Sequence, residues 1–297
     1  LYLTGYKSVS IDDIKNFRQL NSICAGHPEY KKNTGIETTT GPLGQGLGNA
    51  VGMAIGEEIF RKKFGSNLIN HKTYVIASDG DLMEGISHEA MSLAGHLKLK
   101  NLIILFDNNK ISIDGSTSLS VSDNFKKRFE GYNWNFQEIN GHNEKQILKA
   151  IKKASKSNKP NIISCKTIIG FGSPNKSGKA SSHGAPLGEE EVELVRKKLK
   201  WRSQPFETPS EILESWREIG KKGKSIEEEW KESLSKKSPK IKSELEKMMN
   251  HSNLENLEKI IKEEKTKYFN SKPVMATRQC SSSVIESVSE FLPELIG

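Results

Sequence analysis

Within residues 1–190, short apolar stretches alternate with stretches of helical periodicity. Four stretches rich in apolar and β-branched residues predict buried strands: 73–78, 101–106, 135–139 and 161–166. Strands that alternate with helices form βαβ units, whose strands run parallel. We therefore expect an α/β fold with a mostly parallel sheet flanked by helices.

Helical patterns precede and separate the predicted strands. They lie at 10–20, where Ser10 suits the capping position, at 43–64 and at 84–98. The 43–64 helix contains four glycines: Gly46, Gly48, Gly52 and Gly56. A glycine inside a helix costs about 1 kcal/mol relative to alanine. So many glycines indicate that another backbone or a ligand approaches this helix closely.

The pattern changes near Glu189. Of the 45 basic and 37 acidic side chains, 20 basic and 18 acidic lie in 189–272, within amphipathic helical patterns. After Pro273 a helical pattern of different character begins. We predict an α/β domain at 1–188, a charged helical connector and linker at 189–271, and the start of a truncated domain at 272–297. We also expect both ends of the chain to be cut.

The charge of the chain is concentrated in one segment. Residues 144–180 contain nine lysines and one glutamate, a net charge of +8 that equals that of the whole chain. Nucleic-acid sites usually combine lysine with arginine and stacking aromatic residues. This segment has no arginine and only one aromatic residue, Phe171. We interpret the lysines as a solvated helix face and expect no nucleic-acid partner.

The cysteine content and the hydropathy of the chain indicate the cellular compartment of the protein. The three cysteines are widely spaced and odd in number, which fits a reducing environment better than a disulfide framework. No apolar run of about 18 residues is present, so we expect no membrane span. No signal-peptide pattern is visible at the N-terminus. We therefore expect a cytoplasmic protein without a membrane partner.

Candidate chemistry lies where two predicted strands end. Asp79 and Gly80 directly follow the strand at 73–78, and Asn109 follows the next strand, 30 residues later. Ligands of open α/β sheets bind at the carboxyl ends of the strands. A carboxylate, an amide and a backbone carbonyl are the oxygen ligands that Mg²⁺ or Ca²⁺ prefers. Gly80 would let a diphosphate approach the backbone, near the first N–H groups of the helix predicted from Glu84.

These two stretches resemble the magnesium–diphosphate motif of thiamine-diphosphate enzymes. Six other stretches resemble transketolases more specifically and occur in the same order: GHPE at 26–29, TTTGPLGQG at 38–46, MEGISHE at 83–89, ISIDG at 111–115, KTIIGFGS at 166–173 and SHGAPLG at 182–188. The resemblance covers nearly the whole chain and is weakest at 221–270. It implies the thiamine-diphosphate-binding fold, followed by a helical connector.

The resemblance implies a role for individual residues around the cofactor. Asp79, the side chain of Asn109 and the carbonyl of Ile111 would bind Mg²⁺ or Ca²⁺. Gly80 and Asn109 would contact the diphosphate. The aminopyrimidine and thiazolium rings of thiamine diphosphate would be lined by three consecutive residues: Gly41, Pro42 and Leu43.

Four further residues take roles toward the substrate and the partner subunit. His183 would lie near both cofactor and donor sugar, and His27 would hydrogen-bond the ketose. Arg278 matches an arginine that grips the substrate phosphate, as its bidentate fork allows. Glu84 matches a buried carboxylate near the subunit interface. One departure is visible: Ser78 stands where the family usually has glycine, and we expect binding to be retained.

A transketolase transfers a two-carbon ketol unit in the pentose phosphate pathway. The donors are xylulose 5-phosphate or sedoheptulose 7-phosphate, and the acceptors are ribose 5-phosphate or glyceraldehyde 3-phosphate. The resemblance implies a homodimer with the site at its interface. The pyrimidine half of the site should follow Gly297, so we expect this chain alone to be inactive. Two alternatives stay open: a stand-alone thiamine-diphosphate-binding subunit that needs a partner chain, and dihydroxyacetone synthase.

Overall fold

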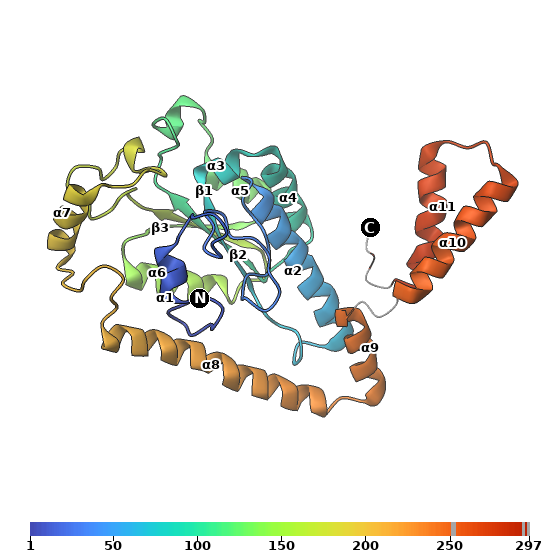
Figure 1. Cartoon of the computed structure of the whole chain (residues 1–297). Helices are drawn as coiled ribbons and strands as arrows, with labels where there is room; N and C mark the ends of the chain where they lie inside the picture. Colours follow the sequence, from blue (N-terminus) through green and yellow to red (C-terminus); the bar gives the residue numbers. More distant parts are fainter. Residues whose placement is uncertain (251–253, 293–294, 296–297) are drawn as a thin grey trace. The chain divides into compact units, whose positions relative to one another are not determined.

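The structure is a computed structural model that describes residues 1–250, 254–292 and 295 (Figure 1). Contacts divide the chain into two units, Leu1–Glu227 and Glu228–Gly297, which are described separately. The domain boundaries expected at 188 and 271 stay predictions. The last residues of the expected truncated domain, 293–294 and 296–297, lie outside the described part.

The first unit is built on a parallel sheet. Its four strands are β1 (Thr73–Ser78), β2 (Leu102–Asn108), β3 (Asn135–Asn140) and β4 (Asn161–Lys166), in the order β1-β2-β4-β3. All three strand pairs are parallel. The predicted α/β class is therefore confirmed. Strand β2 continues two residues beyond the predicted end, because Asp107 and Asn108 remain paired with β4. The side-chain Nδ2 of Asn108 donates to the hydroxyl of Ser164 at 3.0 Å inside the sheet.

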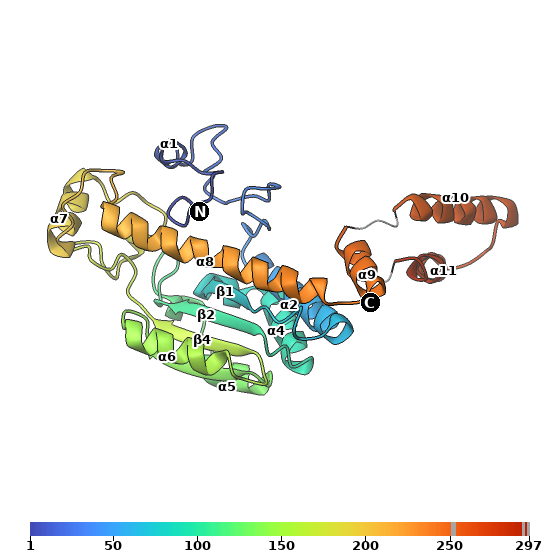
Figure 2. The same ribbon diagram turned by 90° about the horizontal axis from the view of Figure 1, so that it is seen from below.

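Helices cover both faces of this sheet (Figures 1 and 2). The larger core includes Leu47, Met91 and Phe129 and packs on Ile104 and Ile162. The helices that provide its side chains are α2 (Gln45–Phe64), α4 (Gly85–His96) and α5 (Phe125–Gly131). Successive strand residues point to opposite faces. Accordingly, their neighbours form a second core with α6 (Glu144–Ala154), made of Ile103, Ile163, Cys165, Ala150 and Ala154.

The lysines of α6 lie on its solvent side. Lys145, Lys149 and Lys152 are exposed on the helix, and Lys156 is exposed just after its end, whereas Ala150 and Ala154 are buried. The interpretation as a solvated helix face is therefore confirmed for the helical lysines. It does not extend to the whole basic segment, because Lys166 ends β4 and pairs with Glu138, and Lys176 donates to the carbonyl of Leu187.

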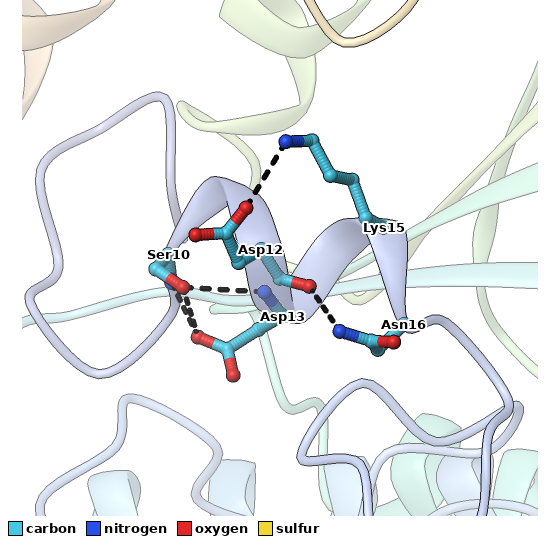
Figure 3. A network of polar contacts seen from close by, with 5 residues as sticks. All are labelled: Ser10, Asp12, Asp13, Lys15 and Asn16. Carbon is cyan, nitrogen blue, oxygen red and sulfur yellow. Dashed lines mark hydrogen bonds and ion pairs between the residues drawn. The ribbon is translucent and has the colours of Figure 1, made fainter.

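The N-terminal helix is shorter than predicted. Helix α1 covers Ile11–Lys15 rather than 10–20. A capping box fixes its start: the Ser10 hydroxyl accepts the N–H of Asp13, and the Asp13 carboxylate accepts the N–H of Ser10 at 2.7 Å (Figure 3). At the other end, the side chain of Asn16 donates to the carbonyl of Asp12. The chain then turns away from the helix, since Arg18 has a φ of 62°.

The segment after β1 also differs from the prediction. A short helix, α3 (Asp79–Met83), begins directly at the strand end, and α4 starts only at Gly85. The helix expected at 84–98 is present as α4, with Glu84 as its N-cap, but α3 before it was not predicted. Helix α3 forms because a second capping box, in which Ser78 and Asp81 bond each other's backbone N–H groups, starts a helical turn directly at the end of β1.

The remaining elements are helical. In the first unit they are η1 (Thr117–Leu119), η2 (Ala180–Ser182), α7 (Glu189–Leu199) and most of α8 (Ser210–Ser235). The second unit contains α9 (Pro239–Asn250), α10 (Leu254–Ser271) and α11 (Thr277–Ser289). Helices α10 and α11 contact each other, and Ser287 donates to Glu264 at 3.0 Å. Among the described residues, no helix is both long enough and apolar enough to span a membrane.

Candidate functional site

The two polar stretches singled out in the sequence meet at the carboxyl edge of the sheet. Ser78, the last residue of β1, is paired with Asp107 of β2. The chain continues from these partners to Asp79 on one strand and Asn109 on the other. The backbone N–H of Lys110 donates a hydrogen bond to the Asp79 carboxylate. The predicted convergence of Asp79 with the segment after β2 is therefore present.

Asp79 carries a buried and incompletely satisfied carboxylate. The residue is 3% exposed, and its Oδ2 has no hydrogen-bond partner among the described residues. Burial raises the pKa of Asp79 to about 6, and the nearby charge of Asp107 adds to this rise. Buried polar atoms are nearly always paired. A divalent cation at Oδ2 would supply the missing partner, so the donor set fits a metal.

The loop after β2 presents the other predicted ligands. The Asn109 Oδ1 accepts the N–H of Ile111 at 2.9 Å, and its Nδ2 lies 3.4 Å from an Asp107 oxygen. These contacts orient the amide with its nitrogen toward Asp107 and its oxygen toward the loop. Lys110 has a φ of 60°, which turns the backbone sharply between Asn109 and Ile111. A bridge between Ile111 and Ser116 closes the loop.

Gly80 lies in the first turn of α3, directly beside Asp79. A Cβ atom built on Gly80 would lie 3.2 Å from Leu43 Cδ1 and 3.9 Å from the Ser78 hydroxyl. Any side chain here would narrow the space toward Leu43. The absence of a side chain at Gly80 therefore keeps the backbone accessible at the end of β1, as the sequence analysis expected of a diphosphate site.

A cavity of 280 Å³ brings together two predicted cofactor residues and one predicted substrate residue. His27, Gly41 and Leu43 line it together with Asp81 of α3. A Cβ on Gly41 would lie 3.4 Å from the Cβ of His27, so the two segments are in direct contact. The carbonyl of Pro42 accepts the N–H of Gln45 at the start of α2.

Asp81 links the loop at this cavity to the end of β1, and no role was predicted for it from the sequence. Its Oδ1 accepts the N–H of Gly44 at 3.1 Å, and its Oδ2 accepts the N–H of Ser78 at 2.8 Å. Gly44 has a φ of 78°, and a Cβ there would come within 2.8 Å of the Glu84 Cβ. The Ser-x-x-Asp pattern of a capping box was the sequence signal that would have revealed Asp81.

A second cavity, of 470 Å³, lies along the same sheet edge. Asp107, Asn109, His142 and Thr167 are among its lining residues. The Thr167 hydroxyl donates to Asp107. The His142 Nε2 accepts the N–H of Ile168 at 2.9 Å. His142 and Thr167 were both missed, because the partners they orient lie far away in the sequence.

His183 lies directly after η2, in the short segment that leads to α7, and its side chain is exposed. The segment before η2 is anchored by Glu191 of α7. The Glu191 carboxylate accepts the Ser173 hydroxyl, and Asn175 donates to it from both its backbone and its side chain at 2.8 Å. These bonds hold the pKa of Glu191 down to about 2. His183 does not line either of the two cavities above, so its role stays a prediction.

Glu84 and Arg278 do not line either cavity. Glu84 is the N-cap of α4 and is exposed in the single chain. The burial expected of Glu84 would therefore require a partner subunit to cover it. Arg278 belongs to the second unit, where it lies exposed in the first turn of α11. Its role also stays a prediction.

The chain matches the family described as "Transketolase, thiamine diphosphate binding domain" over residues 1–254. It is 47% identical over 305 residues to a transketolase of Buchnera aphidicola subsp. Acyrthosiphon pisum, covering 100% of this chain and 46% of that protein. It is 46% identical over 309 residues to transketolase 2 of Escherichia coli, covering 100% of this chain and 45% of that protein. The chain thus spans slightly less than half the length of these relatives.

Solved structures show the same fold. The transketolase of Campylobacter jejuni superposes with a TM-score of 0.80 at 42% identity, over 84% of this chain and 39% of that chain. The transketolase of Leishmania mexicana superposes with a TM-score of 0.86 at 34% identity, over 99% of this chain and 44% of that chain.

Proposed function

The chain belongs to the transketolase family, and we propose that it forms the diphosphate- and metal-binding part of a transketolase. The observation that carries this proposal is the buried Asp79 carboxylate, with one oxygen unpartnered, beside the Asn109 loop at the ends of two paired strands. The proposed enzyme transfers a two-carbon ketol unit from a ketose phosphate to an aldose phosphate. That reaction places it in the pentose phosphate pathway. Its three free cysteines support a cytoplasmic location.

Asp79, the Asn109 Oδ1 and the carbonyl of Ile111 would hold Mg²⁺ or Ca²⁺. All three ligands are oxygens, which suits these cations. The metal would neutralise the Asp79 charge that burial and the neighbouring Asp107 disfavour. Gly80 and Asn109 would then contact the diphosphate, which the metal also binds.

The cavity beside His27 supports the placement of the rest of the cofactor. Gly41, Pro42 and Leu43 form the loop that lines or adjoins this cavity, and Asp81 fixes the following Gly44. Bound thiamine diphosphate supplies the carbanion chemistry of ketol transfer. The protein supplies the position of the rings and the exclusion of water.

His27 is the side chain best placed to contact the sugar, because it lies against Gly41, lines this cavity and is exposed. An imidazole can donate a hydrogen bond to a ketose oxygen and transfer a proton near neutral pH. In the assembled enzyme, the segment that carries His183 would place its imidazole beside the donor sugar. Arg278 would bind the substrate phosphate through its guanidinium group.

The proposed enzyme is a homodimer, and one face of α2 and α4 supports this. A Cβ atom built on Gly48 would lie 3.7 Å from the Cγ1 of Ile86, whereas Gly52 and Gly56 face open space. Glycines four residues apart share one side of a helix. On α4, Ile86 and Leu93 lie seven residues apart and are 48% and 45% exposed. A second copy of the chain on this face would bury these apolar groups and cover Glu84.

A chimeric enzyme tests the proposed function. This chain would replace the matching N-terminal 45% of Escherichia coli transketolase 2. We expect the chimera to convert xylulose 5-phosphate and ribose 5-phosphate to the two transfer products, and the isolated chain to convert neither. A chimera that folds, dimerises and binds thiamine diphosphate but transfers no ketol unit would contradict the proposal. Activity of the isolated chain would contradict its assignment as only the diphosphate half of the site.

A further inference from the structure

The helix that carries Asp79 depends on contacts at its ends. Helix α3 contains only 5 residues. An isolated helix of this length is unstable, because the first turn costs more backbone freedom than its few hydrogen bonds recover. Ser78 and Asp81 cap its start. The orientation of α3 therefore also depends on what binds the carbonyl groups at its other end.

Arg128 binds that other end. Its Nη2 donates to the carbonyl of Leu82 at 2.7 Å, across 46 positions of sequence. Leu82 is fully buried, so this carbonyl would otherwise lack water. The cation also suits the negative end of a helix. The Ser87 hydroxyl donates to the carbonyl of Asp81 and so reinforces the same turn.

The guanidinium group of Arg128 is itself held in place. Its side chain is 9% exposed, and Nη1 bonds Asp123 at 3.3 Å. The group lies 5.9 Å from the ring of Phe125 and 5.5 Å from that of Phe129. Its Nε is buried and has no hydrogen-bond partner among the described residues. A cation buried with an unused donor is costly to a fold, and its one short bond is directed at α3.

We propose that Arg128 is a positioning residue for the metal site. By binding the Leu82 carbonyl it fixes α3, and thereby the direction in which Asp79 presents its unpartnered Oδ2. The inference rests on the proposed function for the identity of the ligand. The hydrogen bond by which Arg128 fixes α3 does not depend on any ligand.

The test compares Arg128→Met with Arg61→Met in the 297-residue chain. Arg61 is a matched control: it ion-pairs with Glu57 and Glu58 on α2, is 20% exposed, and also has a buried Nε without a hydrogen-bond partner in the described residues. The first readout is amide hydrogen exchange of residues 79–83 in the absence of ligand, which reports local opening. The second is calorimetric titration of the chimeric enzyme, carrying the same substitutions, with thiamine diphosphate and Mg²⁺ at a temperature where all variants are folded.

We expect Arg128→Met to accelerate exchange in residues 79–83 at least tenfold and to weaken binding at least tenfold. Arg61→Met should change both by less than twofold. Arg128→Lys, which keeps a donor for the Leu82 carbonyl, should recover part of both effects and serves if the Met variant does not fold. Unchanged exchange in residues 79–83, or an equal effect of Arg61→Met, would overturn the proposal. Accelerated exchange in the Arg128→Met chain, together with a parent chimeric enzyme that binds no cofactor, would support the hold of Arg128 on α3 and count against the proposed function instead.

Discussion

Ser78 and Asp107 are paired residues at the ends of two adjacent parallel strands. From this pair the chain continues to Asp79 after β1 and to Asn109 after β2. Two residues that are 30 positions apart in sequence therefore lie at the same edge of the sheet. The metal and diphosphate roles proposed for this chain depend on that pairing.

Asp79→Asn should stabilise the metal-free chain at neutral pH. The pKa of Asp79 is raised to about 6 in the folded chain, from 3.8. Between these two pH values the folded state retains a proton that the unfolded state has released, so stability falls as the pH rises. The variant avoids this cost, which amounts to at most about 3 kcal/mol above pH 6.

Urea unfolding with a metal chelator present, at pH 4 and pH 7.5, measures this effect. The stability gained by Asp79→Asn should be larger at pH 7.5 than at pH 4. Asp114→Asn is the control, because Asp114 is exposed. An equal gain at both pH values would show that the buried charge of Asp79 is not the cause.

Ser78→Ala should cost about 1 kcal/mol of unfolding free energy, because the N-cap of α3 loses its side-chain bonds. Ser78→Gly should cost only a few tenths of a kcal/mol, since glycine is tolerated at N-caps. Ser10→Ala is a matched control, because the same capping box occurs on the exposed helix α1. Thermal or urea unfolding measures all three. If only Ser78→Ala, and not Ser10→Ala, also weakens cofactor binding, α3 serves the site. Equal binding in both variants would contradict that role.

Gly52→Leu should prevent dimerisation without unfolding the chain. Gly52 faces open space in the single chain, so leucine fits there and suits a helix better. A second copy on the same face would collide with it. Gly223→Leu on α8 is the control, because Gly223 also faces open space. Sedimentation measurements on the chimeric enzyme should show monomers for Gly52→Leu alone, and a dimer in both variants would exclude this face.

His27→Ala in the chimeric enzyme should lower turnover about 100-fold or more, the range typical for a lost proton donor or acceptor. Cofactor affinity should stay within a few-fold, because the contact proposed for His27 is with the sugar rather than with the diphosphate. His96→Ala, on the exposed side of α4, should leave both unchanged. Loss of cofactor binding in His27→Ala would show that His27 contacts the cofactor instead.

Local patterns predicted much of this fold. Apolar stretches located all four strands, and the position of Asp79 and Asn109 after two of them predicted their meeting. Helix α3 was missed, because its five residues are too few to show a period. The contact of Arg128 with Leu82, and that of His142 with Ile168, could not be predicted, because they join segments whose proximity only the sheet order β1-β2-β4-β3 creates.

The most direct test of the central claim is the location of the metal. Crystals of the chain grown with Mn²⁺ and thiamine diphosphate would locate Mn²⁺ by its anomalous scattering. We predict a peak about 2.0–2.6 Å from an Asp79 carboxylate oxygen, the Asn109 Oδ1 and the Ile111 carbonyl, the distances at which oxygen ligands bind such cations. A bound cofactor whose Mn²⁺ contacts neither Asp79 nor Asn109 would contradict the account.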